Sequence, residues 1–216
     1  MTRPTRSVDL RRLRQTVPRA AGTAAAQAAP AAIDRRRRHL NDYMLLYLFT
    51  YDAEIQPEPF TVDTDGGQLR SMFVRAAETA VYSVLGQQTI PGLGASSISG
   101  RLDWGNDQLL LGTDDVARAT IRAAILTEDG AHIDVSYDVT GYVGAGGSRR
   151  ITEHDHDASF GNEDFPYEAP FVTAHRFETA HPRYRWLNAQ QGIGFGKFQI
   201  IYSEFRRVTC DVYAIT

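Results

Sequence analysis

The chain has 216 residues, of which 43% are apolar and 23% charged, and this composition is typical of a globular protein. Its formal charge of −3 hides a division: ten Arg against two acids give residues 1–40 a charge of +8, so residues 41–216 carry −11. An acidic body argues against nucleic acid as its main partner. No run of roughly 18 apolar residues is present, so we expect no membrane span.

Residues 1–40 are rich in Arg, Ala, Thr and Pro and contain no aromatic residue. Such a segment buries too little apolar surface to offset its ordering entropy, so we expect a disordered arm. A secretion signal is one alternative, but the alanine-rich stretch 22–32 is a poor apolar core. The pair Arg11 and Arg12 fits a twin-arginine signal with the same weakness, and contact of the arm with nucleic-acid phosphates is a third reading.

From residue 41 onward the hydrophobic period is two, which predicts one β domain over residues 41–216. Residues 43–51 are apolar on both faces, as in a strand covered on both sides. Residues 117–125 and 131–140 alternate cleanly and flank Asp129-Gly130, the strongest short-range hairpin signal. Further strands are predicted at residues 69–75, 79–85, 98–104, 108–111 and 207–214.

Helical patterns are almost missing from this body, where only residues 182–189 suggest one short turn. Residues 144–170 form a long polar connection, of the kind that is often functional or mobile. Eight or more short strands without crossover helices predict an all-β antiparallel barrel with little helix. A barrel is preferred to a sandwich because closure removes the strand edges. The single cysteine, Cys210, forms no internal disulfide and suits a reducing cytoplasm.

Three blocks of sequence resemble the domain-of-unknown-function 3237 family of small β-barrel proteins. They are Ser-Gly-Arg-Leu-Asp-Trp at residues 99–104, Arg122 with Thr-Glu-Asp-Gly-Ala at 127–131, and Arg-Phe-Glu-Thr-Ala-His-Pro-Arg-Tyr-Arg-Trp-Leu-Asn at 176–188. The resemblance covers residues 41–216 and implies a small barrel with an internal cavity. It supplies no established reaction. Arg101 and Leu102 replace glycines that the family usually has before the tryptophan, so no ligand is carried over.

The sequence supports neither a metal site nor a nucleotide site. His154-Asp155-His156-Asp157 offers imidazole and carboxylate ligands for a divalent metal, but it lies in a polar loop, where solvated side chains are the simpler reading. The glycine-rich run Gly192-Ile193-Gly194-Phe195-Gly196 lacks the strand-then-helix setting of a nucleotide fingerprint. We therefore expect neither a metal nor a cofactor.

Three residues are predicted to carry chemistry. Arg122 lies in mid-strand, and we expect it to point inward and stabilise a substrate anion, the alternative being an ion pair with Glu178 or Asp103. Glu178 and His175 are the candidate acid–base groups. For Glu178 the competing reading is a surface ion pair with Arg176 or Arg183.

Five further residues are predicted to contact substrate. Two tryptophans lie beside polar groups and turns, where they can wall a cavity or belong to the core. The predicted substrate-binding residues are Trp104, Asp103, Trp186, Tyr184 and Asn188.

These features predict a cofactor-independent cyclase, isomerase or lyase acting on a small, partly apolar carbonyl or polyketide-like metabolite. The alternative is a non-catalytic β-barrel that binds a small molecule. A third reading is an assembly protein whose arm docks a partner. A small-molecule ligand is the expected partner, without nucleic acid or membrane, and homo-oligomerisation is left open.

Overall fold

The computed structural model describes residues 44–55, 60–73, 80–82, 89–90, 94–95, 98–153 and 160–215. The arm predicted for residues 1–40 and the His154–Asp157 run both lie outside these residues. Within the described part of the chain, no helix is long and apolar enough to cross a membrane.

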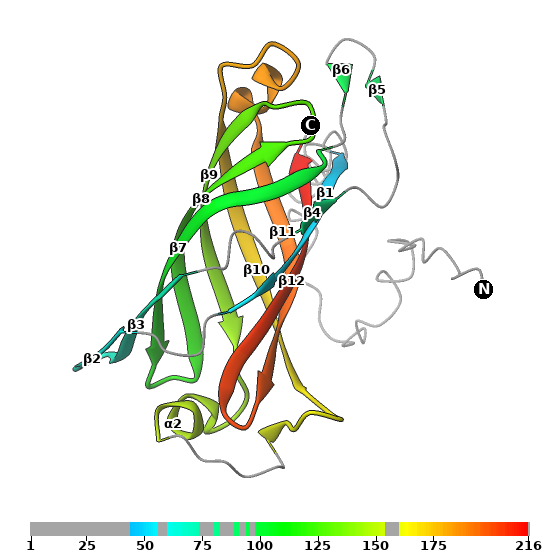
Figure 1. The fold of residues 1–216 in the computed structure, drawn as a ribbon. Helices are drawn as coiled ribbons and strands as arrows, with labels where there is room; N and C mark the ends of the chain where they lie inside the picture. The colour runs from blue at the N-terminus through cyan, green and yellow to red at the C-terminus, as the bar shows by residue number, and fades with distance from the viewer. Residues whose placement is uncertain are drawn as a thin grey trace, which may run out of the picture. The chain divides into compact units, whose positions relative to one another are not determined.

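Eight of the described strands form a closed antiparallel barrel, which confirms the predicted fold class (Figure 1). Around the barrel they run β1 (Leu45–Glu54), β12 (Glu204–Ile215), β11 (Gln191–Ile201), β10 (Tyr167–Glu178), β9 (His132–Tyr142), β8 (Val116–Thr127), β7 (Gly100–Gly112) and β4 (Ala80–Tyr82). Pairing of β7 with β8 and of β4 with both β1 and β7 closes the ring.

The smaller elements lie outside this ring. The hairpin of β2 (Phe60–Thr64) and β3 (Gly67–Phe73) pairs with the second half of β7, and β2 is exposed along its length. A short ladder joins β5 (Thr89–Ile90) to β6 (Gly94–Ala95). Helix α2 (Gly147–Thr152) interrupts the connection that the sequence predicts to be irregular, and the 3₁₀ helix η4 (Arg185–Ala189) occupies the predicted short turn.

Alternation decides which side chains fill the barrel. Along β8 the buried residues include Ala119, Ile121 and Ala123, whereas Arg118 and Arg122 are exposed between them. Strands β9 and β10 follow the same period of two. Because an eight-stranded barrel is just wide enough for side chains to fill, the inward face is the core of the domain. The fully buried core side chains include Leu48, Phe49, Leu109, Leu111, Ile125, Ile133 and Ile200 from the strands and Leu187 from η4.

A β-bulge on β7 changes the alternation halfway along that strand. Leu102 pairs with Ile125 and Trp104 with Ala124, so Asp103 is an extra residue in the ladder. Leu102 is therefore buried before the bulge, and Asp107 is buried after it. Without the bulge, every second residue counted from Leu102 would point into the barrel, and Asp107 would face solvent.

The predicted Asp-Gly hairpin between β8 and β9 is also present. The Thr127 amide donates to the Ala131 carbonyl at 2.9 Å, and Gly130 takes a φ of 83°, which a side chain would disfavour. The Thr127 hydroxyl adds a 2.5 Å bond to Asp129. This turn fixes the register between β8 and β9.

Candidate functional site

The barrel interior contains a small void to which β1, β7, β8, β9, β10, β11 and β12 all contribute residues. Its volume is about 20 Å³, which is room for roughly one water molecule. Three lining residues carry a polar group, namely Tyr51, Asp107 and Tyr137. The rest of the lining is apolar and consists of Ala53, Ile55, Leu102, Ile121, Val139, Phe171, Phe198 and Val208.

Asp107 is the carboxyl group that faces this void. Its side chain is directed inward by the bulge at Asp103, and the residue is only 9% exposed. The Oδ1 atom makes no hydrogen bond within the described part of the chain. Burial disfavours the ionised form and raises the pKa of Asp107 to about 7. A carboxyl that changes charge near neutral pH can both accept and return a proton there.

Two tyrosines meet across the lumen from opposite walls of the barrel. Tyr51 comes from β1 and Tyr137 from β9, and their ring centroids lie 6.0 Å apart. Burial raises the pKa of both phenols, and the charge of Asp107 further raises that of Tyr137. Both side chains are therefore neutral O–H donors at any pH near neutrality.

His175 is the one predicted acid–base residue that the structure places inside the barrel. It is 1% exposed, and its Nε2 atom lies 2.7 Å from the Thr173 hydroxyl. Its ring stacks on Tyr137 with centroids 4.4 Å apart. Burial lowers the pKa of His175 to about 3, so the imidazole is neutral and a weak base. Cys210 lies near Tyr51, and burial raises the pKa of its thiol to about 12.

The other two predicted catalytic residues lie on the outside of the barrel. Arg122 is exposed, so the inward orientation that we expected is wrong. The reason is that Ile121 and Ala123 occupy the inward positions of β8. Glu178 is likewise exposed at the end of β10. Within the described residues, no ion pair joins Arg122 to Glu178 or to Asp103.

The predicted aromatic walls are not brought together around the void. Trp104 is 45% exposed on the outer face of β7, and Asp103 is exposed at the bulge beside it. Trp186 lies in η4, where it is partly buried and packs against the core. That these three residues bind substrate stays a prediction, and none of them lines the void.

Tyr184 and Asn188 hold the corner around η4. The Tyr184 hydroxyl donates to Asp129 at 3.1 Å, which ties this corner to the β8–β9 hairpin. The Asn188 amide accepts a bond from the Thr179 amide at 2.9 Å and donates to the Thr179 carbonyl at 3.0 Å. These contacts give both residues a structural role.

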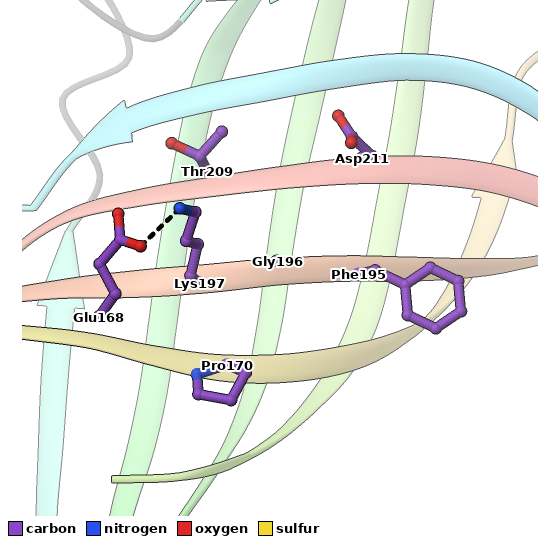
Figure 2. Close-up of a pocket in the computed structure, with 7 residues that line it drawn as sticks. All are labelled: Glu168, Pro170, Phe195, Gly196, Lys197, Thr209 and Asp211. Carbon is purple, nitrogen blue, oxygen red and sulfur yellow. Dashed lines mark hydrogen bonds and ion pairs between the residues drawn. The ribbon is translucent and has the colours of Figure 1, made fainter. Parts of the chain in front are cut away.

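Two hollows on the outer surface are alternative sites. A depression of about 370 Å³ is lined by residues of β10, β11 and β12, among them Gly196, and Lys197 pairs there with Glu168 at 2.6 Å (Figure 2). A larger groove of about 950 Å³ beside η4 includes Glu178 and Asn188. Both are open to solvent, which screens charge and weakens acid–base catalysis. The buried groups of the lumen are better suited to acid–base catalysis, because solvent does not screen them.

The residues that the sequence failed to indicate are Asp107, Tyr51 and Tyr137. The tyrosines carried a readable signal, because Tyr137 has the parity of buried Ile133 and Val135. Asp107 was harder to recognise, since Asn-Asp before an apolar run is typical of a strand boundary. No group of three His, Cys, Asp or Glu side chains among the described residues could hold a metal.

Known structures share this fold. A protein of unknown function from Rhodopseudomonas palustris is 22% identical, covers 81% of this chain and 98% of its own, and superposes with a TM-score of 0.59. One from Clostridium acetobutylicum is 17% identical, with coverage of 81% and 99% and a TM-score of 0.59. A β-barrel-like protein from Acinetobacter baumannii is 17% identical, with coverage of 81% and 96% and a TM-score of 0.54. At these identities the likeness shows the fold alone.

A search of curated proteins finds no match. A family model described as a protein of unknown function, DUF3237, matches residues 44–215, which is nearly all of the barrel domain. The chain therefore belongs to the DUF3237 family, as its sequence blocks predict.

Proposed function

We propose that the protein is a cofactor-independent enzyme of the isomerase, cyclase or lyase type, which moves a proton on a small, partly apolar carbonyl compound inside the barrel. One observation carries the proposal: the buried carboxyl of Asp107 lines an internal void, and its Oδ1 atom has no hydrogen-bond partner among the described residues. Buried polar groups in folded proteins are otherwise nearly always paired. An unpaired one in a cavity is a candidate for chemistry.

The reaction needs no redox partner. The Asp107 carboxylate removes a proton from the carbon next to the carbonyl, and the electrons of the broken C–H bond form an enolate. The protonated carboxyl then returns the proton to another carbon, which isomerises the substrate. With a pKa near 7, Asp107 performs both steps at neutral pH.

The size of the void favours a compact substrate. A space of about 20 Å³ falls far below the roughly 300 Å³ at which ligand pockets begin. A ligand must therefore displace any water and push aside the aliphatic side chains of Ile55, Leu102 and Val208. This favours a single-ring or smaller carbonyl compound over an extended polyketide.

Exchange of carbon-bound protons tests the proposal directly. A panel of small cyclic ketones and enones is incubated in deuterated buffer with the protein, and loss of the proton next to the carbonyl is followed by NMR. We expect exchange with the wild type and none above background with Asp107→Asn. The control Asp134→Asn, which changes an exposed carboxylate on β9, should exchange like the wild type.

The alternative function is a binding barrel without catalysis, which the mainly apolar lining of the void also suits. Such a barrel would bind members of the same panel saturably but exchange no protons. That result would replace the enzymatic proposal with the binding one.

A further inference from the structure

The polar groups that line the void differ in how they are protonated near neutral pH. Asp107 alternates between charge states near neutral pH, whereas Tyr51 and Tyr137 remain protonated. The neighbouring titratable groups are uncharged as well, since His175 is neutral and the Cys210 thiol is protonated. No fixed positive charge is therefore present among these groups to stabilise an anion. Neutral hydroxyl donors are what the lumen offers instead.

The two phenols are arranged as a pair. They project from opposite walls and lie with ring centroids 6.0 Å apart. Their side chains interact, and this interaction raises the pKa of Tyr51 and opposes the rise in the pKa of Tyr137. Both residues line the void, so Tyr137 can offer its O–H to a ligand there. Stacking on His175 at 4.4 Å holds the Tyr137 ring in place.

We propose that Tyr137, supported by Tyr51, forms an oxyanion-binding site in the barrel lumen, and that the substrate is an enolisable ketone or enone whose enolate oxygen binds there. This inference rests on the proposed function, in which Asp107 moves the proton. Preorganised neutral donors in a dry cavity stabilise developing negative charge strongly, because no solvent must reorient.

The step balances without any further reactant. As Asp107 takes the proton, the C–H electron pair becomes a carbon–carbon double bond and the carbonyl π electrons move to oxygen. That oxygen accepts the hydrogen bond from Tyr137. Return of the proton from Asp107 to a carbon of the conjugated enolate restores the carbonyl. A phenolate has the same planar oxyanion and serves as a stable mimic of this intermediate.

Binding of two rings of similar size tests the inference independently of turnover. Pentafluorophenol is ionised near neutral pH, whereas hexafluorobenzene has no oxygen, and both are observed by ¹⁹F NMR. We expect the wild type to bind the phenolate more tightly than hexafluorobenzene. Tyr137→Phe should weaken phenolate binding tenfold or more and leave hexafluorobenzene binding unchanged, with a smaller loss for Tyr51→Phe. The exposed Tyr142→Phe on β9 is the matched control and should bind both rings like the wild type.

Equal affinity of the wild type for the two rings, or phenolate binding unaltered by Tyr137→Phe, would overturn the oxyanion site. If the phenylalanine variants do not fold, a series of fluorinated phenols of graded acidity is bound to the wild type instead. Affinity should then rise with acidity, and a flat series would overturn the inference. Proton exchange that persists without phenolate preference removes the oxyanion site but keeps the proposed function. Phenolate preference without proton exchange keeps the oxyanion site but removes the proposed function.

Discussion

Replacing Asp107 by Asn should make the protein more stable at neutral and alkaline pH. The pKa of this carboxyl rises from 3.8 to about 7 because burial penalises its ionised form. Each tenfold change in proton affinity corresponds to about 1.4 kcal/mol, so keeping Asp107 ionised in the barrel costs on the order of 4 kcal/mol, as an upper bound. Asparagine has a similar shape and never pays this penalty.

The sign follows from which state holds the proton more tightly. The folded protein binds the Asp107 proton better than the unfolded chain does, so its stability falls as pH rises from about 4 to about 7 and is constant above. The gain from Asp107→Asn is therefore expected to be about 2 kcal/mol at pH 5 and about 4 kcal/mol at pH 8. His175 acts oppositely, since its lowered pKa costs stability as pH falls below 6.5. That contribution is common to both proteins and cancels in the difference.

Urea unfolding at pH 5 and pH 8 measures this difference. Both proteins are unfolded in parallel with the control Asp134→Asn, whose carboxylate is exposed and should give little change at either pH. A gain that is the same at both pH values, or a loss of stability at pH 8, would refute the reasoning. Either result would mean that the Asp107 carboxylate has an ionised partner or ready access to water. Tyr51 and Tyr137 are neutral throughout this range and do not add to the slope.

Three further outcomes are expected. Arg122→Met should change the free energy of unfolding by less than about 0.5 kcal/mol in a thermal melt, because the side chain is exposed. Gly194→Ala should destabilise the barrel by about 1–3 kcal/mol in urea, since the added methyl would lie 2.7 Å from the Cys210 sulfur. Asp129→Ala should cost about 1 kcal/mol at pH 7 by freeing Tyr184. Because the hydrogen bond from Thr127, and then those from Tyr184 and Arg183, lower the pKa of Asp129, its loss should shrink as pH falls through that pKa.

The fold was readable because one face of each long strand is buried. The alternating runs that became β8, β9 and β12 needed no knowledge of their partners, since a period of two is a local property of the strand. The turn at Asp129-Gly130 was equally local. Helix α2 was not predicted, because its six residues carry too little periodicity to stand out in a polar connection.

The site was less readable because it depends on which face of each strand is inside. Either face of β8 could have pointed into the lumen. Only the family resemblance favoured the face that carries Arg122 over the face that carries Ile121. Apolar alternation gives the better rule here: the aliphatic positions are buried and the arginine is exposed. The same rule applied to β9 would have placed Tyr137 in the lumen beside Val135 and Val139. On β10 the same rule buries His175, which the sequence indicated only as an acid–base candidate.

Read from the start of β7, that rule misplaces Asp107, because the bulge at Asp103 breaks the alternation within the strand. If β7 alternated strictly from Leu102, Trp104 would be buried and Asp107 exposed. Such an alternation would make the tryptophan a wall of the cavity. The extra residue Asp103 reverses the orientation of Trp104 and of Asp107. One feature of the backbone therefore accounts for the exposed tryptophan and the buried carboxyl. Because Leu109 and Leu111 share the parity of Asp107, the register that buries these leucines necessarily buries the carboxyl as well. The core and the candidate site are therefore set by the same bulge, and the stability lost by burying Asp107 is offset by the apolar residues that follow it.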